Sequence, residues 1–82
     1  MKISVYTTKT CGYCHMLKQW LQDKNVDYTD YKVDEDSEAA QRMVAMSGQM
    51  GVPFSVIEKD DGSAVGILGF DTRQFEQILA GN

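Results

Sequence analysis

The chain has 82 residues, of which 43% are hydrophobic and 24% charged, and its formal net charge is −4. This length and composition predict one folded domain over residues 1–82, and the acidic balance disfavours nucleic acid, which needs a basic surface. No apolar run approaches a membrane span, and the N-terminal MKISVY lacks the continuous apolar stretch of a signal peptide. We therefore expect a cytoplasmic protein with no membrane partner.

An alternating pattern opens the chain and predicts a strand. Ile3 and Val5 are apolar and alternate with polar neighbours. Residues 7–10 are polar and predict a loop, in which Thr10 is a candidate helix N-cap. Apolar residues then recur every three or four positions, which predicts a helix with one buried stripe. The stripe consists of Tyr13, Leu17, Trp20 and Leu21.

A second strand and helix are expected next. Asn25 is a plausible end of the first helix, because Asn tolerates the left-handed conformation. Residues 27–33 are rich in Tyr, Val and Thr and predict a strand. Residues 34–36 are acidic, which suits the positive end of a helix dipole. The predicted helix ends near Gly48 and Gly51. Its expected inner face consists of Ala40, Met43 and Val44.

The last third of the chain predicts a hairpin and a final helix. Residues 54–57 and 64–68 read as strands joined by the Asp61-Gly62 turn. The final helix shows a capping signal, with an N-cap acid, an N3 glutamine and two phenylalanines spaced as a hydrophobic staple. These four residues are Phe70, Asp71, Gln74 and Phe75.

These elements give the order β-α-β-α-β-β-α. The first two strands need a crossover and are expected to be parallel, whereas the last two form an antiparallel hairpin. The expected fold class is therefore α/β, with a four-stranded mixed sheet flanked by helices.

The only two cysteines lie in the segment CGYCH, residues 11–15. This segment can be a redox pair, the start of a metal site or a c-type haem attachment motif. It follows a strand and opens a helix, where residues three apart share a face. The helix N-terminus favours a thiolate at Cys11, and Lys9 adds positive charge. Cys14 lies one turn deeper, and this asymmetry suits disulfide exchange.

The haem and zinc interpretations are less well supported. A c-type haem would use His15 and a later methionine as axial ligands, among Met43, Met46 and Met50. The expected strand before the motif and hairpin after it are not typical of a helical cytochrome. Two cysteines and one adjacent histidine leave tetrahedral zinc coordination incomplete. No metal site is therefore expected.

Three motifs together resemble the glutaredoxins, within the thioredoxin superfamily. CGYC after a first strand resembles their active site, Val52-Pro53 resembles their cis-proline segment, and Gly69 with Asp71 resembles the start of their last helix. The resemblance covers essentially the whole chain, in the same order. It implies a thioredoxin-like fold and a small bacterial dithiol protein in which Cys11 attacks and Cys14 resolves.

The resemblance also implies a groove for glutathione or another substrate. The backbone of Val52 would pair with the substrate cysteine, Lys9 would meet one carboxylate, and the start of the last helix would meet another. The implied groove residues are Lys9, Tyr13, Val52, Pro53, Gly69, Asp71 and Thr72.

Two departures bear on the electron source. Gly51 stands where glutathione-using members commonly have Thr, and Gly69-Phe70 is closer to redoxins that draw electrons from thioredoxin reductase and feed ribonucleotide reductase. We expect a monomeric oxidoreductase acting on protein or glutathione mixed disulfides, with glutathione or thioredoxin reductase as electron source and no tightly bound cofactor. A thioredoxin-reductase-dependent donor and a [2Fe-2S] carrier, which Gly12 permits, are the alternatives.

Overall fold

The computed structural model describes residues 1–80, so the last two residues of the predicted domain 1–82 lie outside the description. The predicted order β-α-β-α-β-β-α is confirmed. The elements are β1 (Lys2–Thr7), α1 (Gly12–Asp23), β2 (Thr29–Lys32), α2 (Ser37–Ser47), β3 (Phe54–Glu58), β4 (Ala64–Leu68) and α3 (Thr72–Ala80). None of the helices among these residues is long and apolar enough to cross a membrane.

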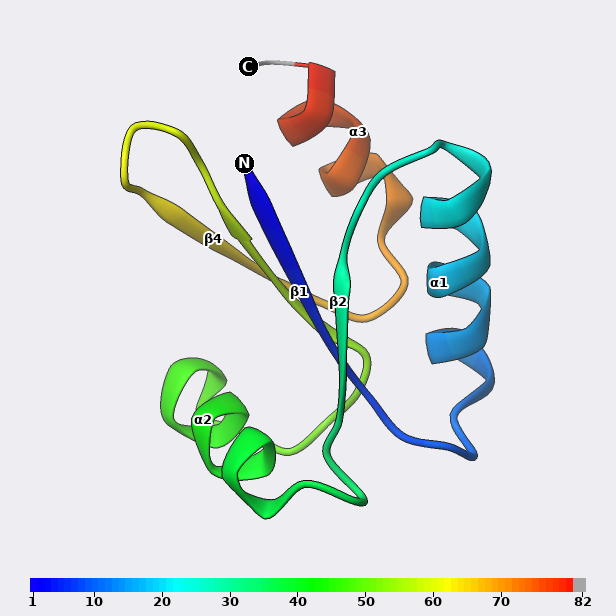
Figure 1. The fold of residues 1–82 in the computed structure, drawn as a ribbon, viewed down its shortest axis with the longest axis vertical. Coiled ribbons are helices and arrows are strands. Elements are labelled where there is room, and N and C mark those ends of the chain that lie inside the picture. The colour runs from blue at the N-terminus through cyan, green and yellow to red at the C-terminus, as the bar shows by residue number, and fades with distance from the viewer. Residues whose placement is uncertain (81–82) are drawn as a thin grey trace.

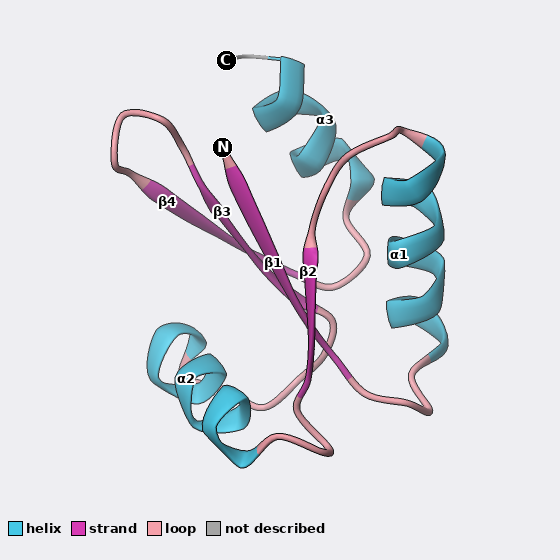
Figure 2. Ribbon diagram, in the orientation of Figure 1, coloured by secondary structure: helices cyan, strands magenta, loops and turns pink. Residues whose placement is uncertain are grey.

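The four strands form one mixed sheet in the order β2-β1-β3-β4 (Figure 2). β1 and β2 are parallel, with Val5 beside Asp30, whereas β3 is antiparallel to both β1 and β4. The expected crossover and hairpin are therefore both present. β1 and β3 are neighbouring central strands, and the last residues of β1 lie beside the first residues of β3, with Tyr6 opposite Phe54.

Helices cover both faces of the sheet, with α1 and α3 on one face and α2 on the other (Figure 1). Because strand residues alternate between faces, β1 contributes to two hydrophobic clusters. The α1/α3 cluster consists of Ile3, Val5, Leu17, Leu21, Ile57, Ile67 and Phe75. The α2 cluster consists of Tyr6, Ala39, Met43 and Phe54.

Most of the expected turns and caps are confirmed. Asn25 has a φ of 58° and follows the end of α1, so it adopts the left-handed conformation there. Asp36 caps α2 by accepting a hydrogen bond from the N–H of Ala39, and Gly48 ends that helix at a φ of 73°. Asp71 accepts a hydrogen bond from the N–H of Gln74 at 3.3 Å, as an N-cap of α3 does.

Three expectations around the start of α1 are wrong. The N-cap is Cys11 and not Thr10, because the Cys11 sulfur itself accepts the hydrogen bond from the N–H of Cys14. Thr7 is the last residue of β1 and is fully buried, so the polar loop begins after it. Tyr13 does not join the buried stripe of α1, since its side chain is 65% exposed.

The bounds of one strand and the buried face of one helix also differ from expectation. The second strand is limited to Thr29–Lys32, so the expected range 27–33 was too long at both ends. In α2 the fully buried residues are Ala39 and Met43, whereas Val44 is exposed. Ala39 and Met43 lie four positions apart, so the buried face of α2 is rotated by about one residue from the predicted face.

Candidate active site

The two cysteines lie at the N-terminus of α1 and form a disulfide, with their Cα atoms 5.2 Å apart. Cys11 has an extended backbone and keeps part of its surface exposed, whereas Cys14 lies on the inner side of the first helical turn and is fully buried. A molecule approaching from solvent therefore reaches Cys11 and not Cys14.

The first turn of α1 favours negative charge on Cys11. The N–H of Cys14 donates a hydrogen bond to the Cys11 sulfur at 3.1 Å. In the dithiol form this N–H, with the positive end of the helix dipole, would stabilise a thiolate at the same place. This stabilisation of a thiolate at Cys11 comes from the helix that Cys11 itself begins.

The start of β3 comes close to Cys11. The Cys11 sulfur lies 3.9 Å from the carbonyl oxygen of Val52, and the Val52-Pro53 peptide bond is cis, as the resemblance implies. Pro53 is fully buried, and its carbonyl oxygen accepts a hydrogen bond from the N–H of Gly69 at 2.7 Å. Val52 thus lies beside Cys11, and the backbone of the adjacent Pro53 is joined to Gly69.

The beginning of α3 continues from that contact. Gly69 has a φ of 86°, a conformation that favours glycine because it has no Cβ. The Asp71 carboxylate accepts hydrogen bonds from the backbone and side-chain nitrogens of Gln74, which lower the pKa of Asp71. Thr72 is the first residue of α3. The Asp71 carboxylate is therefore engaged within its own helix.

Lys9 lies in the loop before Cys11, and acidic residues of a neighbouring loop contact it. Its Nζ is 3.6 Å from the Glu35 carboxylate, and its backbone N–H donates to Asp34 at 3.0 Å. Its carbonyl oxygen accepts a hydrogen bond from Nε2 of His15 at 2.9 Å. The segment after β2, which was expected only to open a helix, therefore also holds the loop that leads to the cysteines.

The side chains proposed as haem ligands lie on opposite faces of the sheet. His15 belongs to α1 and is exposed, whereas Met43 is buried in the α2 cluster. Met46 and Met50 are exposed on or after α2. This placement does not allow His15 and Met43 to serve one haem. Among residues 1–80, no group of three or more His, Cys, Asp or Glu side chains could hold a metal ion.

The sequence model of the glutaredoxin family matches residues 3–60. The chain belongs to the glutaredoxin family. This family consists of thiol-disulfide oxidoreductases, and its fold and cysteine motif are those found here. Glutaredoxin membership also sets the haem interpretation aside.

Individual glutaredoxin relatives agree with this assignment. The chain is 34% identical, over 94% of its length and 96% of the relative's, to a glutaredoxin-like 8.6 kDa protein of the rubredoxin operon of Clostridium pasteurianum. The crystal structure of the thioredoxin-like protein BC3987 superposes with a TM-score of 0.78 at 32% identity, covering 94% of this chain and 99% of that one. The glutaredoxin-like NrdH-redoxin from Escherichia coli, described by its thioredoxin-like activity profile, superposes with a TM-score of 0.78 at 27% identity, covering 95% of each chain.

A charge network that includes Lys18, one helical turn after Cys14, was missed by the sequence analysis. Asp30 accepts hydrogen bonds from the Thr7 hydroxyl at 2.6 Å and from Lys18 and Lys32 at 3.0 Å each. Burial raises the pKa of Asp30, but these three donors outweigh burial and hold the pKa below its usual value. Only the position of Lys18, four residues after Cys14, could have drawn attention to it from the sequence.

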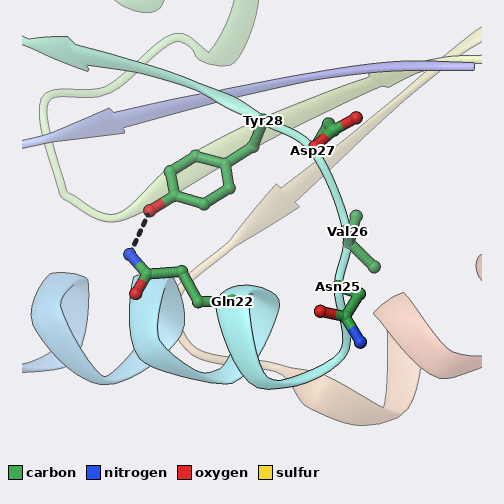
Figure 3. A pocket seen from close by; sticks show the side chains of 5 residues that line it. All are labelled: Gln22, Asn25, Val26, Asp27 and Tyr28. Atoms are coloured by element: carbon green, nitrogen blue, oxygen red, sulfur yellow. Dashed lines mark hydrogen bonds between the residues drawn. The ribbon is translucent and has the colours of Figure 1, made fainter.

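A separate hollow lies at the far end of α1 (Figure 3). It is lined by Gln22, Asn25, Val26, Asp27 and Tyr28. Figure 3 shows the side-chain amide of Gln22 donating to the Tyr28 hydroxyl, at 2.9 Å. The hollow lies where α1 ends and the cysteines lie where it begins, so it is not part of the candidate active site.

Proposed function

We propose that this protein reduces disulfides through its Cys11-Cys14 pair, with Cys11 as the nucleophile and Cys14 as the resolving thiol. The observation that carries this proposal is the asymmetry of the pair, since Cys11 is accessible at a helix N-terminus and Cys14 is fully buried. The position of Val52 also supports it, because the Val52 carbonyl oxygen lies 3.9 Å from the Cys11 sulfur and could contact a substrate bound there.

The reaction proceeds in two exchanges. The Cys11 thiolate attacks one sulfur of a substrate disulfide, forms a mixed disulfide and releases the other sulfur as a thiolate. Cys14 then gives up its proton and attacks the Cys11 sulfur, which releases the second substrate thiol and leaves the Cys11-Cys14 disulfide. Two electrons pass to the substrate, and an external reductant must return two electrons to this disulfide.

We further propose that the reductant is a protein, a thioredoxin-reductase-type flavoprotein, in preference to glutathione. The two charged groups that would bind the glutathione carboxylates and amine are engaged within the chain, Lys9 with Glu35 and Asp71 with Gln74. Gly51 also lacks the side chain that glutathione-using relatives commonly place there. Glutathione would therefore compete with Glu35 for Lys9 and with Gln74 for Asp71.

The test follows NADPH oxidation with the oxidised protein and a disulfide substrate such as insulin. One assay supplies thioredoxin reductase, and the other supplies glutathione with glutathione reductase. We expect turnover with thioredoxin reductase, at least tenfold faster than with glutathione. The opposite preference would refute the choice of reductant, and no turnover in either assay would refute the oxidoreductase proposal.

Two cysteine variants test the roles of the thiols. Cys11→Ser should abolish turnover. Cys14→Ser should stop the reaction at a mixed disulfide on Cys11, which mass spectrometry of the intact protein detects. A Cys11→Ser protein with full activity would show that the roles are assigned wrongly.

A further inference from the structure

A half-buried charge network lies one helical turn from Cys14. Lys18 of α1 and Lys32 of β2 both donate to the same oxygen of Asp30, at 3.0 Å each. Thr7 donates to the other oxygen at 2.6 Å. The side chains of Lys18 and Asp30 are 17% and 18% exposed. Water therefore screens this pair less than it screens the surface charges of the molecule.

The helix and the sheet both place this network beside the cysteine pair. Cys14 and Lys18 are four residues apart on α1, so their Cβ atoms are about 6 Å apart on one helical face. Thr7 is fully buried and shares the α1 face of β1 with Val5. Asp30 is the partner of Val5 in the neighbouring strand. The network therefore extends from the end of β1 to the first half of α1, where Cys14 is buried.

We propose that Asp30 and Lys18 are positioning residues that set how readily the cysteine pair ionises, Asp30 by opposing the thiolate and Lys18 by favouring it. This inference rests on the proposed thiol-disulfide exchange. A negative charge close to a thiol disfavours its ionised form, and a positive charge favours it. The effect is larger in a partly buried site than in water, because the effective dielectric constant is lower.

Other charged groups belong to the segments around the pair, but their interactions differ. Lys9 and Glu35 pair with each other in exposed loops, with side chains 71% and 50% exposed. His15 is exposed and donates to a backbone carbonyl, and Asp71 is engaged by Gln74. The Asp30 network differs because its two principal charges, on Asp30 and Lys18, are held by short hydrogen bonds and largely shielded from solvent.

The experiment measures ionisation of the reduced protein directly, by the absorbance of the thiolate at 240 nm as a function of pH. Asp30→Asn should increase the ionisation constant of the more acidic thiol about threefold to tenfold, and Lys18→Gln should decrease it by a similar factor. Lys18→Arg keeps the positive charge and should restore the wild-type titration. The decisive result is that the two substitutions change the ionisation constant in opposite directions, because a merely structural role would not produce this pattern.

A second measurement reads the dithiol-disulfide equilibrium against dithiothreitol. In this exchange the protein disulfide breaks, a disulfide forms in dithiothreitol, and two electrons with two protons pass to the protein. Because a stabilised thiolate stabilises the dithiol form, Asp30→Asn should shift the equilibrium toward the dithiol and Lys18→Gln toward the disulfide.

Matched controls change the same charges at the far end of α1. Asp23→Asn and Lys24→Gln alter net charge equally but lie more than two turns from Cys14, so each should change the ionisation constant less than twofold. The proposal would be overturned if these controls changed the ionisation constant as much as the network variants do. It would also be overturned if both network variants changed that constant in the same direction, or if neither changed it. Asp30→Ser and Lys18→Met repeat the test if a first variant fails to fold. The titration needs no turnover, so a failure of the proposed function would show separately, in the coupled assay.

Discussion

Two fully buried hydroxyl groups lie on the α1 face of the sheet, and removing them should change the stability of the protein in opposite directions. The hydroxyl of Thr7 donates to Asp30, whereas the hydroxyl of Ser55 has no hydrogen-bond partner among residues 1–80. Ser55 lies in β3 between Val5 of β1 and Ile67 of β4, which are both core residues. An unpartnered hydroxyl there loses its hydration on folding and gains no hydrogen bond in return.

The magnitudes follow from this difference. Ser55→Ala removes a desolvation penalty of about 1–3 kcal/mol while leaving Cβ in place. Thr7→Val keeps the shape of the side chain but removes a hydrogen bond to a charged group, which costs about 1.5–3 kcal/mol. Each kcal/mol moves the melting temperature of a domain this small by about 4–8 °C. We therefore expect Ser55→Ala to raise it by at least about 4 °C and Thr7→Val to lower it by at least about 6 °C.

Thermal unfolding of the disulfide form, followed by far-ultraviolet circular dichroism, measures both changes in one redox state. Urea unfolding at 25 °C provides a second measurement that does not depend on the heat capacity change. A lower melting temperature for Ser55→Ala would refute the reasoning, because it would show that the hydroxyl is hydrogen-bonded in solution. A Thr7→Val variant with unchanged stability would show that the Thr7–Asp30 hydrogen bond contributes nothing to stability.

Three other predictions concern charges near the site. The pKa of Asp30 is below its usual value of 3.8. The ionised Asp30 carboxylate therefore stabilises the fold above pH 3.8, and this stabilisation is lost as the pH falls through the folded pKa. Melting temperatures between pH 5 and pH 2 should fall less steeply for Asp30→Asn than for the wild type. Asp71→Ala removes the N-cap of α3 and should lower the melting temperature, whereas Asp71→Asn, which keeps a capping oxygen, should lower it less. Glu35→Gln releases Lys9 and should lower the KM for glutathione in the coupled assay, with Glu38→Gln, in the first turn of α2, as a charge-matched control.

The hairpin and the N-caps of α2 and α3 were predictable because they depend on local chemistry. The Asp61-Gly62 turn fixes where β3 ends and β4 begins, and β4 has the predicted bounds of residues 64–68. Asp36 and Asp71 cap their helices with side chains that accept hydrogen bonds from N–H groups three residues later. In each case a few neighbouring residues determine the conformation, so no tertiary information was needed.

Predictions that depended on packing were less accurate. The buried face of α2 could not be placed to within one residue, because Ala39, Ala40 and Val44 are all apolar and only contact with the sheet selects among them. Thr10 was expected as the cap of α1, since hydroxyls cap helices more often than sulfur does. Cys11 takes that position, and this places its sulfur at the helix N-terminus where an anion is best stabilised.

The cysteine positions were evident from the sequence, but the Asp30 network was not, because hydrophobic periodicity assigns charged residues to the solvent. Lys18 and Asp30 are brought together only because β1 and β2 are parallel and α1 crosses back over the sheet between them. That crossover also packs the inner side of the first turn of α1, where Cys14 lies, against the sheet. The same topology that buries the resolving thiol therefore brings a carboxylate and an ammonium close to it. If Asp30→Asn and Lys18→Gln change the ionisation constant in opposite directions, then charges that the crossover brings together determine the ionisation of this redox pair along with the Cys-x-x-Cys motif.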